Sequence, residues 1–139
     1  MDFGLSSEQE MLGETVRRCL AETCPLDHVR FCVDAGSAVS DRVMAAFHEI
    51  GLTGLMVPEA HGGLGMTMLD AAVVAEQLGR AVAPVPFLGR SVLAPLALML
   101  AGSPAQQADW LPRIASGAAR FGVAIAGIVE ERDGASVRI

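Results

Sequence analysis

Helix-capping signals recur through the first 106 residues and constrain the fold more than any other feature of the sequence. A capping side chain accepts a hydrogen bond from a free backbone N–H at the start of a helix, and an acid or amide three residues later bonds back. The signals are Ser7-x-x-Glu10, Ser40, Thr67-x-x-Asp70 and Ser103-Pro104-x-Gln106. Apolar side chains at helical spacing follow each of them, so the pattern predicts a mainly α-helical fold.

Glycine and proline residues close these helices. Gly51, Gly79 and Gly117 stand where the apolar periodicity ends. Pro25, at the first position of a new helix, separates two neighbouring helices, and Pro95 bends a long apolar one. The expected helices cover residues 7–23, 26–33, 40–50, 67–79, 88–101 and 104–116.

Two segments break the helical pattern. Residues 52–58 form a short apolar run ending in proline, which favours an extended segment, and the glycine-rich loop 61–65 follows. From Phe121 onward small and branched apolar residues alternate, and Asp133-Gly134 is a hairpin turn signal. An isolated hairpin is only marginally stable, so the sequence predicts a C-terminal β-hairpin belonging to a β-domain whose other strands are missing.

Composition and charge exclude several classes of protein. The chain is 52% hydrophobic and 19% charged, which is typical of a folded domain with a large buried surface. All ten basic residues are arginine and the net charge is -6, which disfavours nucleic-acid binding. The acidic N-terminus does not resemble a secretory signal, so we expect a cytoplasmic protein. The charge-free stretch after Ser91 holds about 12 residues, short of the roughly 20 that span a bilayer.

Three side chains share one helical face in a pattern that could bind metal. Cys24, His28 and Cys32 recur every four residues, and Cys19 would supply a fourth ligand. The spacing lacks the two ligand pairs, separated by a loop, that are typical of zinc sites. The sequence therefore favours free, buried cysteines and no metal.

The glycine loop does not indicate a dinucleotide site. In Gly63-x-Gly65-x-x-Met68, methionine stands where a third glycine or alanine is needed for close helix packing. His61 in this loop is a candidate for ligand contact, with a surface role as the alternative. His48 has no carboxylate or cysteine four residues away, which favours a structural role. The residues alone therefore indicate a helical domain with an appended sheet fragment.

Three further stretches carry a family resemblance. They are Phe3-x-Leu5-Ser6-x-Glu8-Gln9-x-Met11-Leu12, then Gly51-Leu52-x-Gly54-Leu55-x-Val57-Pro58-Glu59-x-x-Gly62-Gly63-x-Gly65 with Ala75-Glu76-Gln77-Leu78-Gly79, and finally Ala101-Gly102-Ser103-x-x-Gln106-Gln107-x-x-Trp110-Leu111-Pro112-x-Ile114-Ala115-Ser116-Gly117. In this order they resemble the N-terminal helical domain of the acyl-CoA dehydrogenase family.

The resemblance implies an N-terminal helical domain over residues 1–118 and the incomplete start of a middle β-domain over residues 119–139. It also implies an FAD-dependent α,β-desaturation of an acyl-CoA thioester, in which a carboxylate removes the α-proton and flavin N5 accepts the β-hydride. That base belongs to a C-terminal domain of the family, so we expect no catalytic residue in this chain. A homo- or hetero-oligomer and an electron-transfer flavoprotein are the implied partners.

The resemblance assigns this domain one wall of the acyl pocket. Phe87, Leu88, Val92 and Leu93 are the candidate lining residues, and each could instead belong to the core. Arg90 either meets a polar acyl end or lies on the surface. Apolar lining favours a hydrocarbon because burial contributes about 0.8 kcal/mol per CH₂.

One stretch departs from the family pattern. The flavin- and thioester-contacting motif, Thr-Glu-Pro followed by Ala-Gly-Ser-Asp, is replaced by Ala124-Ile125-Ala126-Gly127-Ile128-Val129-Glu130-Glu131. The departure favours either a non-catalytic assembly subunit of a heteromeric acyl-CoA dehydrogenase or flavin contacts from elsewhere. An unrelated helical bundle is a third hypothesis, which a helical 52–66 segment would support.

Overall fold

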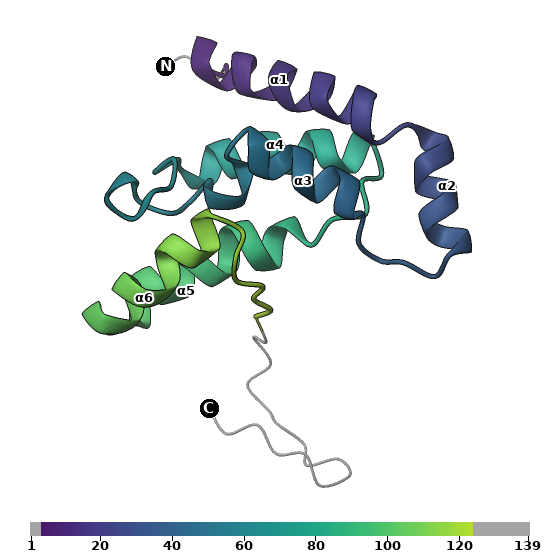
Figure 1. Cartoon of the computed structure of the whole chain (residues 1–139). Coiled ribbons are helices and arrows are strands. Elements are labelled where there is room, and N and C mark those ends of the chain that lie inside the picture. Colours follow the sequence, from purple (N-terminus) through teal and green to yellow (C-terminus); the bar gives the residue numbers. More distant parts are fainter. Residues whose placement is uncertain (1–3, 124–139) are drawn as a thin grey trace, which may run out of the picture.

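The computed structural model describes residues 4–123, and these form a helical domain (Figure 1). The hairpin was expected from Phe121 onward: residues 121–123 are not in a strand, and residues 124–139 lie outside the described residues. The domain boundary at 118 stays a prediction. The elements are α1 (Ser7–Thr23), α2 (Leu26–Asp34), α3 (Asp41–Glu49), the 3₁₀ turns η1 (Leu52–Gly54) and η2 (Glu59–His61), α4 (Met68–Arg80), the π-helical η3 (Leu88–Leu93), α5 (Ala94–Ala101) and α6 (Pro104–Ala115).

The helices are arranged in three levels. α1 lies across one side and packs on α3 and α4, while α5 and α6 pair on the opposite side and η3 joins the two halves (Figure 1). The side chains buried between α1, α3, α4 and η3, which we call the first core, include Val16, Leu20, Val43, Phe47, Leu52, Leu55, Val74, Phe87 and Val92. The second core, between α5 and α6, consists of Val57, Ala94, Leu111 and Ile114.

Capping explains why the helices begin where they do. Ser40 caps α3, and reciprocal capping boxes at Thr67 and Ser103 start α4 and α6, which confirms these three predictions. The first helix spans residues 7–23 as expected, but its cap is Ser6 with Gln9 rather than Ser7 with Glu10. Either serine fits the pattern locally, and the observed register lets Gln9 also donate to Asp70 across the α1–α4 packing.

The structures around Pro25 and Pro95 differ from the predictions. Pro25 is the N-cap of α2 and not its first helical residue. The expected bend at Pro95 is instead a π-helical widening that precedes it, in which the N–H of Ala94 bonds to the carbonyl of Gly89. A proline cannot donate to the preceding turn, so the helix changes its hydrogen-bond register before the proline rather than kinking at it.

The segment that we predicted to be extended is a tightly wound turn. Residues 52–57 form η1 and the following turn, and all six are buried. The left-handed conformation of Gly51, with φ +79°, ends α3 and starts this turn. Its apolar side chains enter both cores, so the prediction of an extended segment was wrong. A wound segment that is buried on every side produces the same continuous apolar run as a buried strand.

Within residues 4–123, no helix is long and apolar enough to cross a bilayer. The same residues contain no group of three or more His, Cys, Asp and Glu side chains placed to hold a metal ion. Cys19, Cys24 and Cys32 are free, and Cys24 and Cys32 are buried. Burial raises the pKa of the Cys24 thiol, which keeps it protonated and unreactive at neutral pH.

We expect a side chain at position 63 to destabilise the glycine loop. A Cβ at this position would overlap the backbone carbonyl and Cβ of Val57, and the backbone cannot move aside cheaply. Gly63→Ala should therefore lower the free energy of unfolding by at least about 2 kcal/mol in urea titrations. The matched control is Gly79→Ala in α4, where a Cβ meets nothing within 4 Å and helix propensity favours alanine. Equal stability of the two variants would contradict the packing argument.

A second prediction concerns Asp70 in the α4 capping box. Hydrogen bonds from the Thr67 hydroxyl and backbone N–H, and then from Gln9, hold the pKa of the Asp70 carboxyl below its usual value. Its stabilisation is thus complete above about pH 4, the unfolded-state value, and is lost as pH falls through the lower folded-state pKa. Asp70→Asn should cost about 1 kcal/mol at pH 7 and less at pH 3, which lies below the unfolded-state pKa of the carboxyl group.

Urea titrations at both pH values test this expectation. Asp109→Asn in α6 is the control, because its weak surface pair with Arg113, at 3.9 Å, should contribute under about 0.5 kcal/mol. A loss for Asp70→Asn that is unchanged by pH would show that the charge of Asp70 does not contribute.

Candidate functional site

The predicted acyl-wall residues separate into two groups on η3 and the turn before it. Phe87 and Val92 are buried in the first core, with exposed fractions of 5% and 2%. Leu88 is 58% exposed and Leu93 is half-buried, so both are accessible from outside the domain. Leu88 and Leu93 therefore offer most of the surface that a ligand could touch, while Phe87 and Val92 lie mainly in the core.

A continuous apolar face extends from Leu93 along α5. We call it the outer stripe, and it consists of Leu93, Leu96, Ala97 and Leu100, which lie at spacings of three and four residues. Leu100 is 78% exposed, and no residue of α5 is polar. Leu93 is the only member of the stripe among the residues predicted from the family resemblance, and the absence of polar side chains from 92 to 101 is the sequence signal for the rest.

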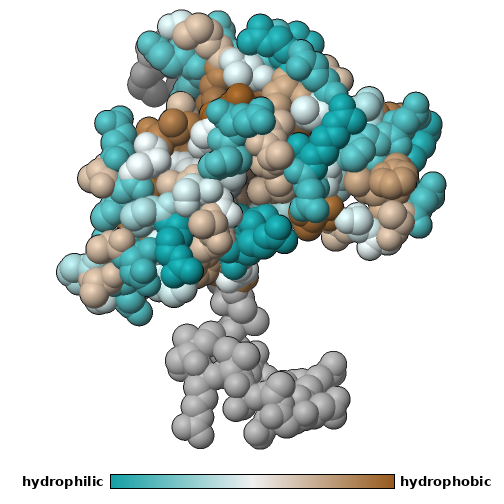
Figure 2. All heavy atoms as spheres, in the orientation of Figure 1, coloured by the Kyte–Doolittle hydropathy of each residue, from teal (hydrophilic) through white to brown (hydrophobic). Residues whose placement is uncertain are grey.

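A shallow apolar pocket adjoins Leu88. Its volume is about 280 Å³, and its walls come from α4 and from the approach to η3: Ala75, Leu78, Val85, Pro86, Phe87, Leu88 and Gly89. In the view of Figure 2, the most hydrophobic residues lie in the seams between helices, and hydrophilic residues cover most of the helix surfaces. The pocket is lined mainly by apolar side chains, and the outer stripe consists of apolar side chains alone.

Arg90 does not join these apolar residues. It lines a different cavity of about 250 Å³, which we call the arginine pocket, together with residues of α3, η1 and the segment after α6. Burial and then the nearby charge of Arg120 lower the pKa of Arg90, while Asp41 acts in the opposite direction. Arg120 was not singled out in the sequence, and it comes from a segment thirty residues away from Arg90.

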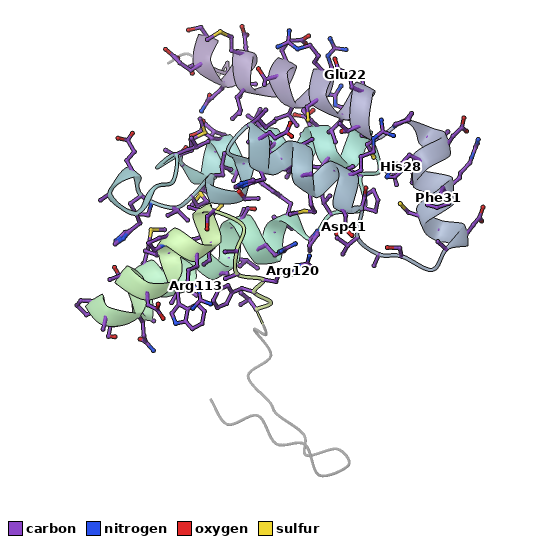
Figure 3. The ribbon with its side chains drawn as sticks, in the orientation of Figure 1. Glu22, His28, Phe31, Asp41, Arg113 and Arg120 are labelled. Atoms are coloured by element: carbon purple, nitrogen blue, oxygen red, sulfur yellow. The ribbon has the colours of Figure 1, made fainter. Side chains whose placement is uncertain are left out.

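The cysteine-histidine cluster proves to be structural. The His28 ring lies 2.7 Å from the Ser40 hydroxyl and 3.7 Å from the Cys32 sulfur, measured from its Nε2 atom. Ser40 also caps α3, so these contacts tie α2 to the start of α3. Figure 3 shows His28 and Phe31 on α2, at the end of the molecule remote from α5 and α6.

The glycine loop closes on itself and leaves no cradle for a phosphate. Backbone hydrogen bonds run from Leu64 to Gly54, from Gly65 to Val57 and from Met66 to Leu55. The position where Gly63 lacks a side chain is filled by Val57. His61 is half-buried in this loop, and its ligand contact stays a prediction. The described residues therefore do not fit a flavin diphosphate at the loop.

The acyl-CoA dehydrogenase N-terminal domain family matches residues 6–118 of the chain. The acyl-CoA dehydrogenase IpdE2 of Mycobacterium tuberculosis is 37% identical over 113 residues, which are 81% of this chain and 35% of that protein.

Two solved structures share the fold. A chain of the ChsE4–ChsE5 complex from Mycobacterium tuberculosis is 30% identical, with a TM-score of 0.83 over 95% of this chain and 36% of that one. An acyl-CoA dehydrogenase complexed with FAD from Bacillus anthracis is 27% identical, with a TM-score of 0.69 over 82% of this chain and 20% of that one. The chain thus spans roughly a third or less of the length of these relatives.

Proposed function

Because the chain belongs to the acyl-CoA dehydrogenase N-terminal domain family, we propose that it forms one wall of the acyl pocket in an FAD-dependent enzyme that desaturates acyl-CoA thioesters. The relatives are oxidoreductases by name. The proposal extends their class of reaction to this chain.

The outer stripe is the observation that carries the proposal. A helix that is apolar on every face is stable in water only when something covers each face. α6 and η3 cover part of α5, but Leu96 stays half-buried, and Ala97 and Leu100 are exposed among the described residues. A hydrocarbon chain lying against this face, or a neighbouring domain that covers the face, would remove its apolar surface from water. The stabilisation would be about 25 cal/mol per Å² of apolar area buried.

The chain's own contribution to the reaction is positioning and exclusion of water. Leu88 and Leu93 would contact the acyl chain, with Phe87 and Val92 fixing their positions from the first core. A dry wall strengthens the electrostatic interactions that stabilise the carbanion-like charge developing at the α-carbon. FAD would supply the hydride acceptor in this chemistry. The family resemblance implies that it would be held mainly by domains outside residues 4–123, which agrees with the poor fit of its diphosphate to the glycine loop.

A non-catalytic assembly subunit is the second candidate function. The similarity to a chain of the ChsE4–ChsE5 complex favours it, because that structure is an assembly of two different chains. The replacement of the flavin-contacting motif by residues 124–131 favours it as well. In this arrangement the same apolar wall would complete a pocket whose flavin is held by the partner.

Production of the protein from its complete reading frame distinguishes the two functions. The enzyme should be isolated with bound flavin, whose absorbance bleaches on addition of an acyl-CoA but not of the free fatty acid. A colourless protein that gains flavin and activity only with a co-expressed second subunit would support the assembly role. A protein that stays colourless and inactive with every candidate subunit would overturn the proposal.

Enlarging the outer stripe should shorten the acyl chain that the active enzyme or complex accepts. Leu93→Phe adds volume where the acyl chain is placed, so kcat/KM should fall about tenfold for a long acyl-CoA and little for a short one. The control is Leu26→Phe on α2, which makes the same exchange at an exposed site in a different helix. An equal effect of Leu93→Phe on both chain lengths would contradict its place in the wall.

A further inference from the structure

Two arginines without an acidic partner face the arginine pocket. Arg90 comes from η3 and Arg120 from the segment after α6, and within residues 4–123 neither has a carboxylate oxygen within 4 Å. Four other arginines have such a partner three or four residues away on their own helix: Arg17 with Glu14, Arg30 with Asp27, Arg80 with Glu76 and Arg113 with Asp109. The arginine pocket therefore combines two arginines that form no ion pair within 4 Å among the described residues with one acid, Asp41, so its charged lining is net positive.

The two guanidinium groups are close enough to repel. The charge of Arg120 opposes protonation of Arg90, in addition to the effect of burial, and so helps to lower the pKa of Arg90. A guanidinium group carries its positive charge at neutral pH. An anion placed between them would replace this repulsion by two charge-assisted contacts.

The other walls of the pocket restrict which anion fits. Asp41 places one negative charge at the cavity, which disfavours a dianion such as phosphate more than a monoanion. Figure 3 shows Asp41 and Arg120 on the same side of the molecule, below α3. Met44 and Ala45 add an apolar wall from the next turn of α3. The volume of about 250 Å³ suits a few carbon atoms rather than a nucleotide.

The floor of the pocket offers a fixed polar group. The Thr53 hydroxyl donates to the carbonyl of Ala115 at 3.0 Å, and Nδ1 of His48 lies 3.5 Å from the same hydroxyl oxygen. Thr53 is 6% exposed, so the contact between η1 and the end of α6 is a rigid base for the cavity. The site is thus assembled from four segments that the first and second cores hold in place.

We propose that the arginine pocket binds the carboxylate of a short aliphatic acid, with Arg90 and Arg120 on the carboxylate and Met44 and Ala45 against its carbon chain. The site is separate from the proposed acyl wall. The arginine pocket and the apolar pocket beside Leu88 share no lining residue, and no residue of the outer stripe lines either cavity. Loss of one function therefore does not entail loss of the other.

Calorimetric titration of the full-length protein with butyrate, a monoanionic short aliphatic acid, at low ionic strength tests the proposal. We expect saturable binding that weakens at least tenfold in Arg90→Gln and in Arg120→Gln. Arg120 is exposed, so its variant should stay folded even if the half-buried Arg90 proves sensitive to substitution. Arg18→Gln is the matched control: Arg18 is an exposed arginine of α1 with no carboxylate within 4 Å among the described residues, and its loss should leave the affinity unchanged.

Two further arms decide the nature of the anion. Inorganic phosphate should bind at least tenfold more weakly than butyrate, and the reverse order would overturn the carboxylate assignment. Glu130, Glu131 and Asp133 of the chain's own C-terminal region are rival occupants. If their combined replacement by Gln, Gln and Asn raises butyrate affinity tenfold or more, the pocket serves an internal ion pair and the proposal fails. Butyrate binding that is absent, or equal in all arginine variants, overturns it as well.

Discussion

The close approach of Gly63 to Val57 is the constraint on which the rest of the domain depends. Val57 belongs to the second core, while Leu52 and Leu55, a few residues earlier in the same turn, belong to the first. The returning glycine loop fixes this turn by three backbone hydrogen bonds, and it can do so only because Gly63 has no Cβ. Gly54 extends the constraint to α6, since a Cβ there would come within 3.1 Å of Ala115. One wound segment therefore holds the two cores together.

Local signals in the sequence predicted the helices well, because capping and apolar spacing act over three or four residues. Ser40, Thr67 and Ser103 each formed the predicted cap. Ser6-x-x-Gln9 and Ser7-x-x-Glu10 fit the capping pattern equally well, and in the observed register Gln9 also donates to Asp70 of α4, 61 residues away in the chain. The prediction for residues 52–57 also failed because it depends on tertiary packing. An apolar run does not reveal whether the fold surrounds it on one side or on all sides.

The candidate sites were predicted only in part, for a related reason. Family resemblance pointed to residues 87–93, but periodicity could not tell that Phe87 and Val92 turn into the core while Leu88 and Leu93 stay accessible, since every one of these side chains is apolar. Arg120 had no local signal beyond the lack of an acid three or four residues away, which it shares with Arg90. Their meeting in one pocket is a property of the fold.

The π-helical segment η3 lies between the two candidate sites and relates them physically. Its i to i+5 bonding inserts one residue into the register before Pro95, and such widened turns are uncommon and concentrate at functional sites. In a regular α-helix, Arg90 and Leu93 would be about 300° apart around the helix axis. The widened turn changes this angle. The widening therefore affects which side chains of η3 lie toward α3 and which lie in the outer stripe. Pro95 has no backbone N–H, so a regular α-helix would gain no hydrogen bond from this residue. The wider register therefore loses no hydrogen bond at Pro95 in comparison with a regular α-helix. The separation of a cationic face from an apolar face within six residues is thus a consequence of backbone geometry as well as of residue type.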